Sequence, residues 1–266
     1  MEKKILYLLT CVGLCWSSCT NEVDEFIGNV EPSTRSVSTA LNANLASLFT
    51  GGAPTLTSAE IKEVNDAYAK MTSINCYRNI DEAVRNKTSY AGTIFLDDTY
   101  ASAYFRKGSL AFPPYGILAS SMEHEFIHMY QRDVQGKKVD TDKEKRDTGM
   151  MEFELAFYQG IIRYIHAGYS WTFKGEDGDP SYQSLWTSGL TDPSLIPQYE
   201  REFQTYVASI CANGKPTSID INEFVKWSNI FGEYSRGYSG KGYKFGNYDY
   251  GTSCILSLIH ISEPTR

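Results

Sequence analysis

The sequence predicts an α+β fold that is rich in helix, with a small antiparallel or mixed sheet ahead of a helix that carries two histidines. Two observations predict this class. Three short runs of apolar and β-branched residues, separated by polar turns, are typical of strands. Longer segments on both sides of them have helical periodicity and helix start signals. Residues 41–254 are long enough to form one domain with a sizeable core.

Residues 1–18 have the features of a lipoprotein signal peptide. A basic start precedes an apolar run from Ile5 to Trp16, which is too short to span a bilayer. Small residues directly before Cys19 resemble a lipobox, which predicts lipidation of Cys19; a plain cleaved secretory signal is the alternative. Residues 19–40, rich in Ser, Thr, Asn and acids, predict a flexible tether. Glu22, Asp24 and Glu25 resemble the surface-export tags of some Gram-negative lipoproteins, although they can also be part of a solvated tether. The resemblance implies the cell envelope of a Gram-negative bacterium, on the periplasmic or surface face of the outer membrane.

The first helix of the domain is expected to begin at Thr57. Thr57 and Glu60 form a capping-box pattern, and the helical pattern continues to about Met71. The three strand-like runs follow, at Thr93–Leu96, Ala101–Phe105 and Ser109–Phe112.

The next helix is expected over Ile117–Gln131. Pro113 and Pro114 precede it, and neither Pro nor Gly interrupts it. His124 and His128 lie inside this helix, four residues apart, so both side chains project from one face and can close on a single metal ion.

Glu125 completes an H-E-x-x-H pattern, the arrangement found in zinc metallopeptidases. A carboxylate one residue after the first ligand can act as a general base. Such a short pattern also arises by chance, and in that case the histidines are ordinary surface or core residues.

A third metal ligand is expected from a second long helix, Met150–His166. Glu152 and Glu154 lie about 200° apart around its axis, so only one of them can face the histidines. A carboxylate among apolar neighbours must be paired or metal-bound, which favours Glu154. The small Ala156 one turn beyond Glu152 would let two helices approach closely, which favours Glu152. The residues alone leave both open, and both can also be ordinary helix carboxylates.

The segment His124–Gln131, followed 24 positions after His128 by Glu152-Phe153-Glu154, resembles the gluzincin-type zincins, including bacterial lipoproteins with an HExxHxYQ and ExE layout. The resemblance covers about residues 90–166. It implies a zincin-like fold, Zn²⁺ held by His124, His128 and Glu152 with Glu154 as the alternate, and Glu125 as the catalytic residue. It also implies that an antiparallel edge strand beside the cleft binds an extended peptide.

The remaining segments complete the domain. Helices are expected over Pro197–Ala212 and Asp220–Tyr234, the second opened by Asp220 and Glu223 as a capping box. Residues 255–266 resemble a translated adapter read-through, a non-native tail, which leaves open whether the domain is truncated at residue 254.

The charge of the chain limits its expected binding partners, and its cysteine content limits the expected disulfides. The formal net charge is -7 and no Lys/Arg cluster occurs, which argues against nucleic acid or an anionic membrane surface, so the N-terminal lipid is the expected membrane contact. Three cysteines lie outside the signal: Cys76, Cys211 and Cys254. They form no disulfide framework, although a single bridge from Cys76 to Cys211 is compatible with an oxidising compartment.

These observations together predict a secreted, lipid-anchored zinc metallopeptidase that hydrolyses peptide or protein substrates through metal-activated water. The alternative is a non-catalytic lipoprotein, either with a zincin fold or with an aromatic-rich binding surface. The second form of that alternative is suggested by 19 Tyr and 4 Trp residues.

Overall fold

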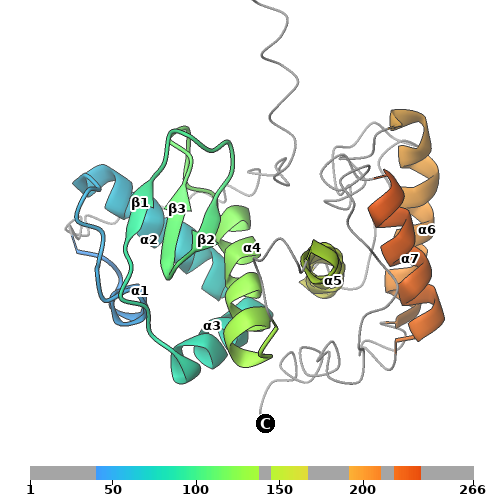
Figure 1. Ribbon diagram of the computed structural model, residues 1–266, viewed down its shortest axis with the longest axis horizontal. Coiled ribbons are helices and arrows are strands. Elements are labelled where there is room, and N and C mark those ends of the chain that lie inside the picture. The colour runs from blue at the N-terminus through green and yellow to red at the C-terminus, as the bar shows by residue number, and fades with distance from the viewer. Residues whose placement is uncertain (1–39, 138–144, 167–191, 211–218, 235–266) are drawn as a thin grey trace, which may run out of the picture.

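The computed structural model describes residues 40–137, 145–166, 192–210 and 219–234. The α+β class and the small sheet expected from the sequence are confirmed (Figure 1). Among the described helices none combines the length and apolarity that crossing a bilayer requires. The helices are α1 (Ala43–Leu48), α2 (Ser58–Ser73), α3 (Asn75–Lys87), α4 (Ala119–Met129), α5 (Lys145–His166), α6 (Ile196–Ile210) and α7 (Ile221–Tyr234), with a π-helical turn η1 (Tyr130–Val134) after α4 and a 3-10 turn η3 (Pro193–Leu195) before α6.

The sheet has three strands: β1 (Ile94–Leu96), β2 (Tyr104–Arg106) and β3 (Ser109–Phe112). Their order is β1-β3-β2, and the sheet is mixed, because β1 runs parallel and β2 antiparallel to β3. Lys107 and Gly108 form a two-residue turn between β2 and β3, with φ of 50° and 79°. Two positive φ angles are typical of the type I′ turn, whose twist matches that of paired strands.

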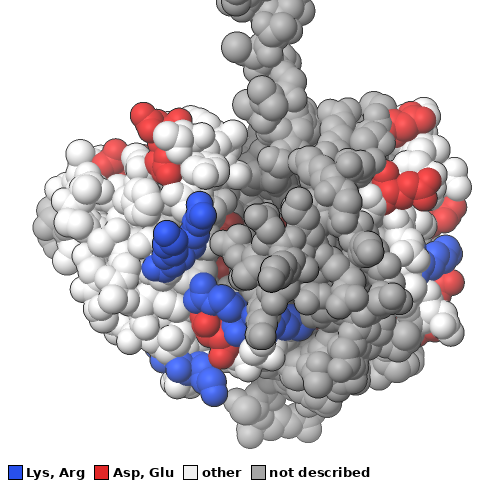
Figure 2. All heavy atoms as spheres, in the orientation of Figure 1, with Lys and Arg blue, Asp and Glu red and all other residues white. Residues whose placement is uncertain are grey.

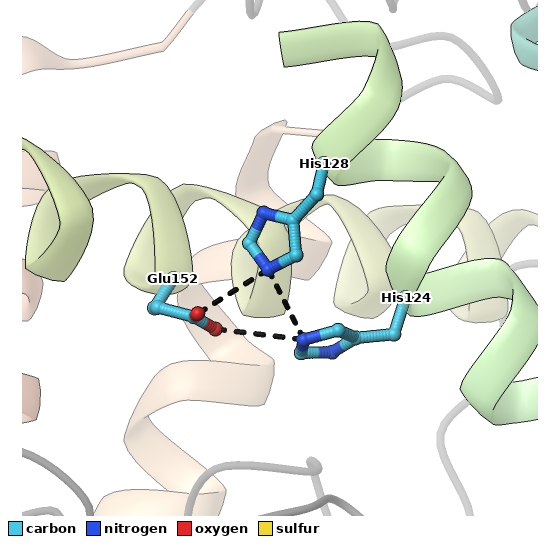
Figure 3. A group of neighbouring side chains, drawn as sticks. All are labelled: His124, His128 and Glu152. Atoms are coloured by element: carbon cyan, nitrogen blue, oxygen red, sulfur yellow. Dashed lines mark hydrogen bonds and ion pairs between the residues drawn. The ribbon is translucent and has the colours of Figure 1, made fainter. Parts of the chain in front are cut away.

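Helix α4 is held between the sheet and two earlier helices. It packs on α2 and α3 and also contacts β2. Its buried face carries Met122, Phe126 and Ile127, each with 0% exposure, and the ring of Phe126 lies 6.1 Å from that of Tyr68 in α2. This packing leaves the face with the two histidines toward α5 (Figures 1 and 3).

Helix α5 lies between α4 on one side and the pair α6 and α7 on the other, and Figure 1 views it end-on. An aromatic cluster joins α5 to that pair, with ring centroids 5.0–6.4 Å apart. Burial of these rings contributes to the core and fixes α5 beside α4. The cluster consists of Phe153, Phe157, Phe203, Tyr206, Phe224 and Trp227.

Several expectations for local structure are confirmed. The capping box at α2 is formed, because the Thr57 N–H donates to Glu60 Oε2 at 2.6 Å and the Glu60 N–H donates to Thr57 Oγ1 at 3.3 Å. Asp220 Oδ1 accepts from the backbone N–H of Asn222 at 2.8 Å, at the start of α7. Strand β2 begins at Tyr104, three residues after the start of the run in the sequence.

Two helices were missed by the sequence analysis, α1 and α3. Helix α3 buries residues at helical spacing, among them Cys76, Tyr77, Ile80 and Val84. That periodicity was a usable signal, but no side chain caps the N-terminus of α3.

The predictions for the two ends of the chain lie outside the described residues. These are the signal peptide at 1–18, Cys19 and the tether, and the tail at 255–266. Cys76 is a free, buried thiol, and Cys211, the partner considered from the sequence, lies outside the described residues.

Candidate metal centre

The two histidines of α4 are brought together by helical spacing alone. Side chains four residues apart lie one turn above each other on the same face. The Nε2 atoms of His124 and His128 are 3.1 Å apart, and the two rings meet edge to face, with centroids separated by 4.7 Å. Both side chains are half-buried, with exposures of 23% and 14%.

Glu152 reaches this pair from α5 (Figure 3). Its Oε1 lies 3.2 Å from Nε2 of His128, and its Oε2 lies 3.6 Å from Nε2 of His124. Of the two glutamates that the sequence left open, Glu152 joins the histidines. Glu154 is 1% exposed and instead contacts Gln131 and Lys137.

The spacing of the three donors fits one ion. Two ligand atoms about 2.1 Å from a tetrahedral centre lie roughly 3.4 Å from each other. The two Nε2 atoms are 3.1 Å apart, close to that value, and each of them has one of the two Glu152 oxygens near it, Oε1 at 3.2 Å from His128 and Oε2 at 3.6 Å from His124. His124, His128 and Glu152 therefore form a group that could hold a metal ion, and within the described residues no other such group of three occurs.

Burial and close charges perturb the acid–base properties of the group. Desolvation, with the neighbouring His128, lowers the pKa of His124 to about 4. Burial also opposes protonation of His128, but the carboxylate of Glu152 outweighs it, with help from Glu125 and Gln131, and the pKa of His128 rises to about 9. In the absence of a cation, a proton on His128 therefore balances the charge of Glu152.

Glu125 lies beside the group rather than in it. Its carboxylate is 4.0 Å from Nε2 of His124 and its side chain is only 6% exposed. Burial raises the pKa of Glu125 to about 8; His128 opposes the shift, the carboxylate of Glu152 adds to it, and the nearby backbone N–H of Phe105 opposes it to a smaller extent. A carboxyl group with a pKa near neutrality can both take up and give back a proton.

Strand β2 presents its outer edge to this glutamate. Arg106 and Ser109 flank the two-residue turn and form a hydrogen-bonded pair. Pairs alternate along antiparallel strands, so the next pair, Phe105 and Leu110, is a non-hydrogen-bonded pair. The N–H of Phe105 consequently points away from β3, and its lowering effect on the pKa of Glu125 indicates that this N–H is near the carboxyl group. The sequence suggested one of three runs as a strand beside the cleft but did not indicate which.

Basic side chains gather near this strand. Figure 2 shows Lys and Arg over β2 and the nearby end of α4, on a chain whose net charge is -7. Arg132 lies over the ring of Phe105 at 4.3 Å and over that of Tyr90 at 5.4 Å, and it pairs with Asp133 at 2.5 Å. The guanidinium group therefore braces β2 from the turn that follows α4.

Two polar contacts of the site had no role in the sequence analysis. Gln131 was part of the quoted motif, yet nothing in its spacing indicated that it hydrogen-bonds to His128. Lys137 belongs to a charged segment that the sequence presents as ordinary surface, but its ammonium contacts the buried Glu154. Pairing across 17 residues has no local signal.

The site thus combines three convergent donors with a buried carboxyl group of near-neutral pKa and an adjacent strand edge. No family model matches this chain, and the comparisons with curated proteins and with solved structures found no match.

Proposed function

We propose that this protein is a zinc-dependent metallopeptidase with a zincin-like fold, in which His124, His128 and Glu152 hold Zn²⁺ and Glu125 is the catalytic base. The observation that carries the proposal is the convergence of two imidazole nitrogens from α4 and the carboxylate of Glu152 from α5, with one ligand atom of each residue within 4.8 Å of the others. An N-terminal lipid on Cys19 would attach the enzyme to the outer membrane of a Gram-negative cell.

The donor set favours a transition metal such as zinc over Mg²⁺ and Ca²⁺. Two imidazoles and one carboxylate are the protein ligands of many catalytic zinc sites, and Mg²⁺ or Ca²⁺ prefer oxygen ligands throughout. Three protein ligands leave one tetrahedral position for water or substrate. Side-chain exposures of 14–23% for the three residues are consistent with access from solvent.

When bound, Zn²⁺ would polarise the scissile carbonyl and lower the pKa of water at the open position. Glu125 removes the proton from the attacking water and delivers it to the leaving amine. Its pKa of about 8 before the cation binds reflects burial, and the positive charge of an ion nearby would favour its ionised form.

Peptide substrates would bind along β2. This strand is at the edge of the sheet, antiparallel to β3, and next to α4. An extended peptide can add to such an edge through main-chain hydrogen bonds, which are independent of side-chain sequence. Because β2 packs against α4, which carries Glu125, a peptide on this edge would have its backbone near the proposed base.

Metal content and hydrolysis test the proposal together. Purified wild-type protein is expected to bind one zinc per chain, and His128→Ala to bind none at the same free zinc concentration. Zinc-loaded wild type should cleave members of a fluorescence-quenched peptide library, and removal of zinc by a chelator should stop cleavage. Less than stoichiometric zinc in the wild type would contradict the metal site. Stoichiometric zinc without cleavage would favour a non-catalytic binding lipoprotein.

A further inference from the structure

Gln131 connects the candidate ligand His128 to helix α5. Its side chain is fully buried and lies three residues after His128, on the same side of the helix. The Oε1 atom is 3.0 Å from Nδ1 of His128. The Nε2 atom donates to the carbonyl oxygen of Met151 at 3.0 Å and to Oε2 of Glu154 at 2.8 Å.

These contacts allow only one orientation of the Gln131 amide. A backbone carbonyl can only accept, so the NH2 group must face Met151. Glu154 Oε2 acts as an acceptor as well, because it also receives the ammonium of Lys137. The carbonyl oxygen of Gln131 therefore faces His128, and Nδ1 of His128 must carry the hydrogen.

The orientation of the amide has a direct consequence for the metal site. An imidazole with its hydrogen on Nδ1 offers the lone pair of Nε2 to a ligand. That Nε2 is the atom 3.1 Å from His124 and 3.2 Å from Glu152. Metal-binding histidines commonly donate their second N–H to a fixed acceptor, which sets the tautomer and the ring orientation.

The chain following α4 supports this arrangement. Gln131 belongs to the π-helical turn η1, in which the Gln135 N–H donates to the Tyr130 carbonyl at 3.1 Å. The backbone N–H of Lys137 then donates to the Gln131 carbonyl at 3.0 Å, which returns Lys137 toward the helix. Its side chain thereby reaches Glu154.

We propose that Gln131 is a positioning residue for the metal centre and holds the ring of His128 with Nε2 directed at the ion. Glu154 and Lys137 keep the amide of Gln131 oriented with its carbonyl oxygen toward His128. Glu154, one of the two glutamates that the sequence offered as a ligand, has a supporting role instead. The inference rests on the proposed function, since it requires that His128 binds a metal.

The test compares zinc affinities by competition with a chromophoric chelator. Gln131→Leu removes the acceptor, and the affinity should fall about 10- to 100-fold, as is usual when the partner of a ligating histidine is lost. Gln204→Leu is the matched control, because Gln204 is also 1% exposed but lies in α6, beyond α5 from the site. Its zinc affinity should equal that of the wild type.

Proton NMR of the zinc-loaded protein gives a readout independent of activity. The hydrogen on Nδ1 of His128 should appear as a slowly exchanging downfield signal in the wild type and in Gln204→Leu. The signal should exchange rapidly with solvent in Gln131→Leu, because its buried acceptor is gone. If Gln131→Leu does not fold, the wild-type spectrum decides: a slowly exchanging Nδ1 signal of His128 supports the inference, and rapid exchange of that hydrogen in the zinc-loaded wild type overturns it.

The outcomes distinguish the two proposals. A wild-type protein that binds no zinc overturns the proposed function and the role of Gln131 with it. A wild type that binds zinc, together with unchanged affinity in Gln131→Leu or an equal loss in Gln204→Leu, overturns the positioning role alone.

Discussion

Replacing Glu125 with glutamine is the sharpest test of the proposed chemistry, because the geometry predicts separate effects on metal binding and on turnover. The side chain of Glu125 does not belong to the three-donor group, and its nearest carboxylate oxygen is 4.0 Å from Nε2 of His124. Glutamine has nearly the same shape and retains an oxygen that can accept from the Phe105 N–H. Zinc should therefore remain stoichiometric in Glu125→Gln.

The expected loss of activity follows from the role of a buried base. Proton transfer by a positioned side chain contributes about 10²- to 10⁴-fold to a rate, so kcat should fall by that factor, or about 3–5 kcal/mol of activation free energy. The substitution should not lower the stability of the metal-free protein. Burial raises the folded-state pKa of Glu125 from 4.5 to about 8, so its contribution to stability declines as the pH rises from 4.5 to 8, and glutamine removes that pH-dependent cost.

The assay is kcat and KM of zinc-loaded proteins on one quenched peptide, with zinc content measured on the same samples. Glu123→Gln is the matched control, since Glu123 is also a buried carboxyl group of α4 and lies outside the three-donor group. It should retain zinc and turnover. Full activity in Glu125→Gln would refute the assignment of the base, and loss of zinc in that variant would refute the assignment of the ligands.

Three further predictions concern pH, stability and thiol reactivity. The pKa of His128 is raised from 6.5 to about 9, so its proton stabilises the metal-free fold fully below pH 6.5, and this stabilisation is lost as the pH rises through 9. Because zinc competes with the same proton, zinc affinity should rise roughly tenfold per pH unit between 7 and 9. A flat pH profile in chelator competition would contradict this expectation. Asp81→Ala should lower the free energy of unfolding by about 3–5 kcal/mol in urea titrations, because the buried Asp81 accepts hydrogen bonds from Tyr68 at 2.8 Å and from Arg85 at 2.9 and 2.8 Å. Asp66→Ala is the control and should have little effect, because the Lys62–Asp66 pair is exposed. Equal losses in the two variants would argue against the buried network. Burial raises the pKa of Cys76 to about 11, so the thiol should be unreactive in the folded protein at pH 8. Peptide mapping after iodoacetamide treatment should find Cys76 unmodified in the folded protein and modified in urea. Rapid labelling of the folded protein would show that the thiol is accessible.

The part of the site that lies on one helix was predictable from the sequence. His124 and His128 converge because of helical geometry, which acts over a few residues and needs no knowledge of the rest of the chain. The capping box of Thr57 and Glu60 is local in the same way. Both predictions depended only on spacing, and the structure has the expected geometry in both places.

The choice between Glu152 and Glu154 required the tertiary structure. The two side chains leave α5 in nearly opposite directions, so the rotation of that helix decides which of them meets the histidines. The rotation is set by the packing of Phe153 and Phe157 against rings of α6 and α7, far along the chain. Burial argued for Glu154 at the level of the sequence, and its burial is explained by Lys137 and Gln131 rather than by proximity to the histidines.

By itself, the sequence determined a helix-rich α+β chain, the pair of histidines on one helical face and the carboxyl group between them, because each of these depends on periodicities of a few residues. Only the tertiary structure decided the strand order β1-β3-β2, the strand edge beside Glu125, the third donor and the amide of Gln131 behind His128. These features join segments that are distant in the chain, and their geometry follows from how whole helices and strands pack against one another.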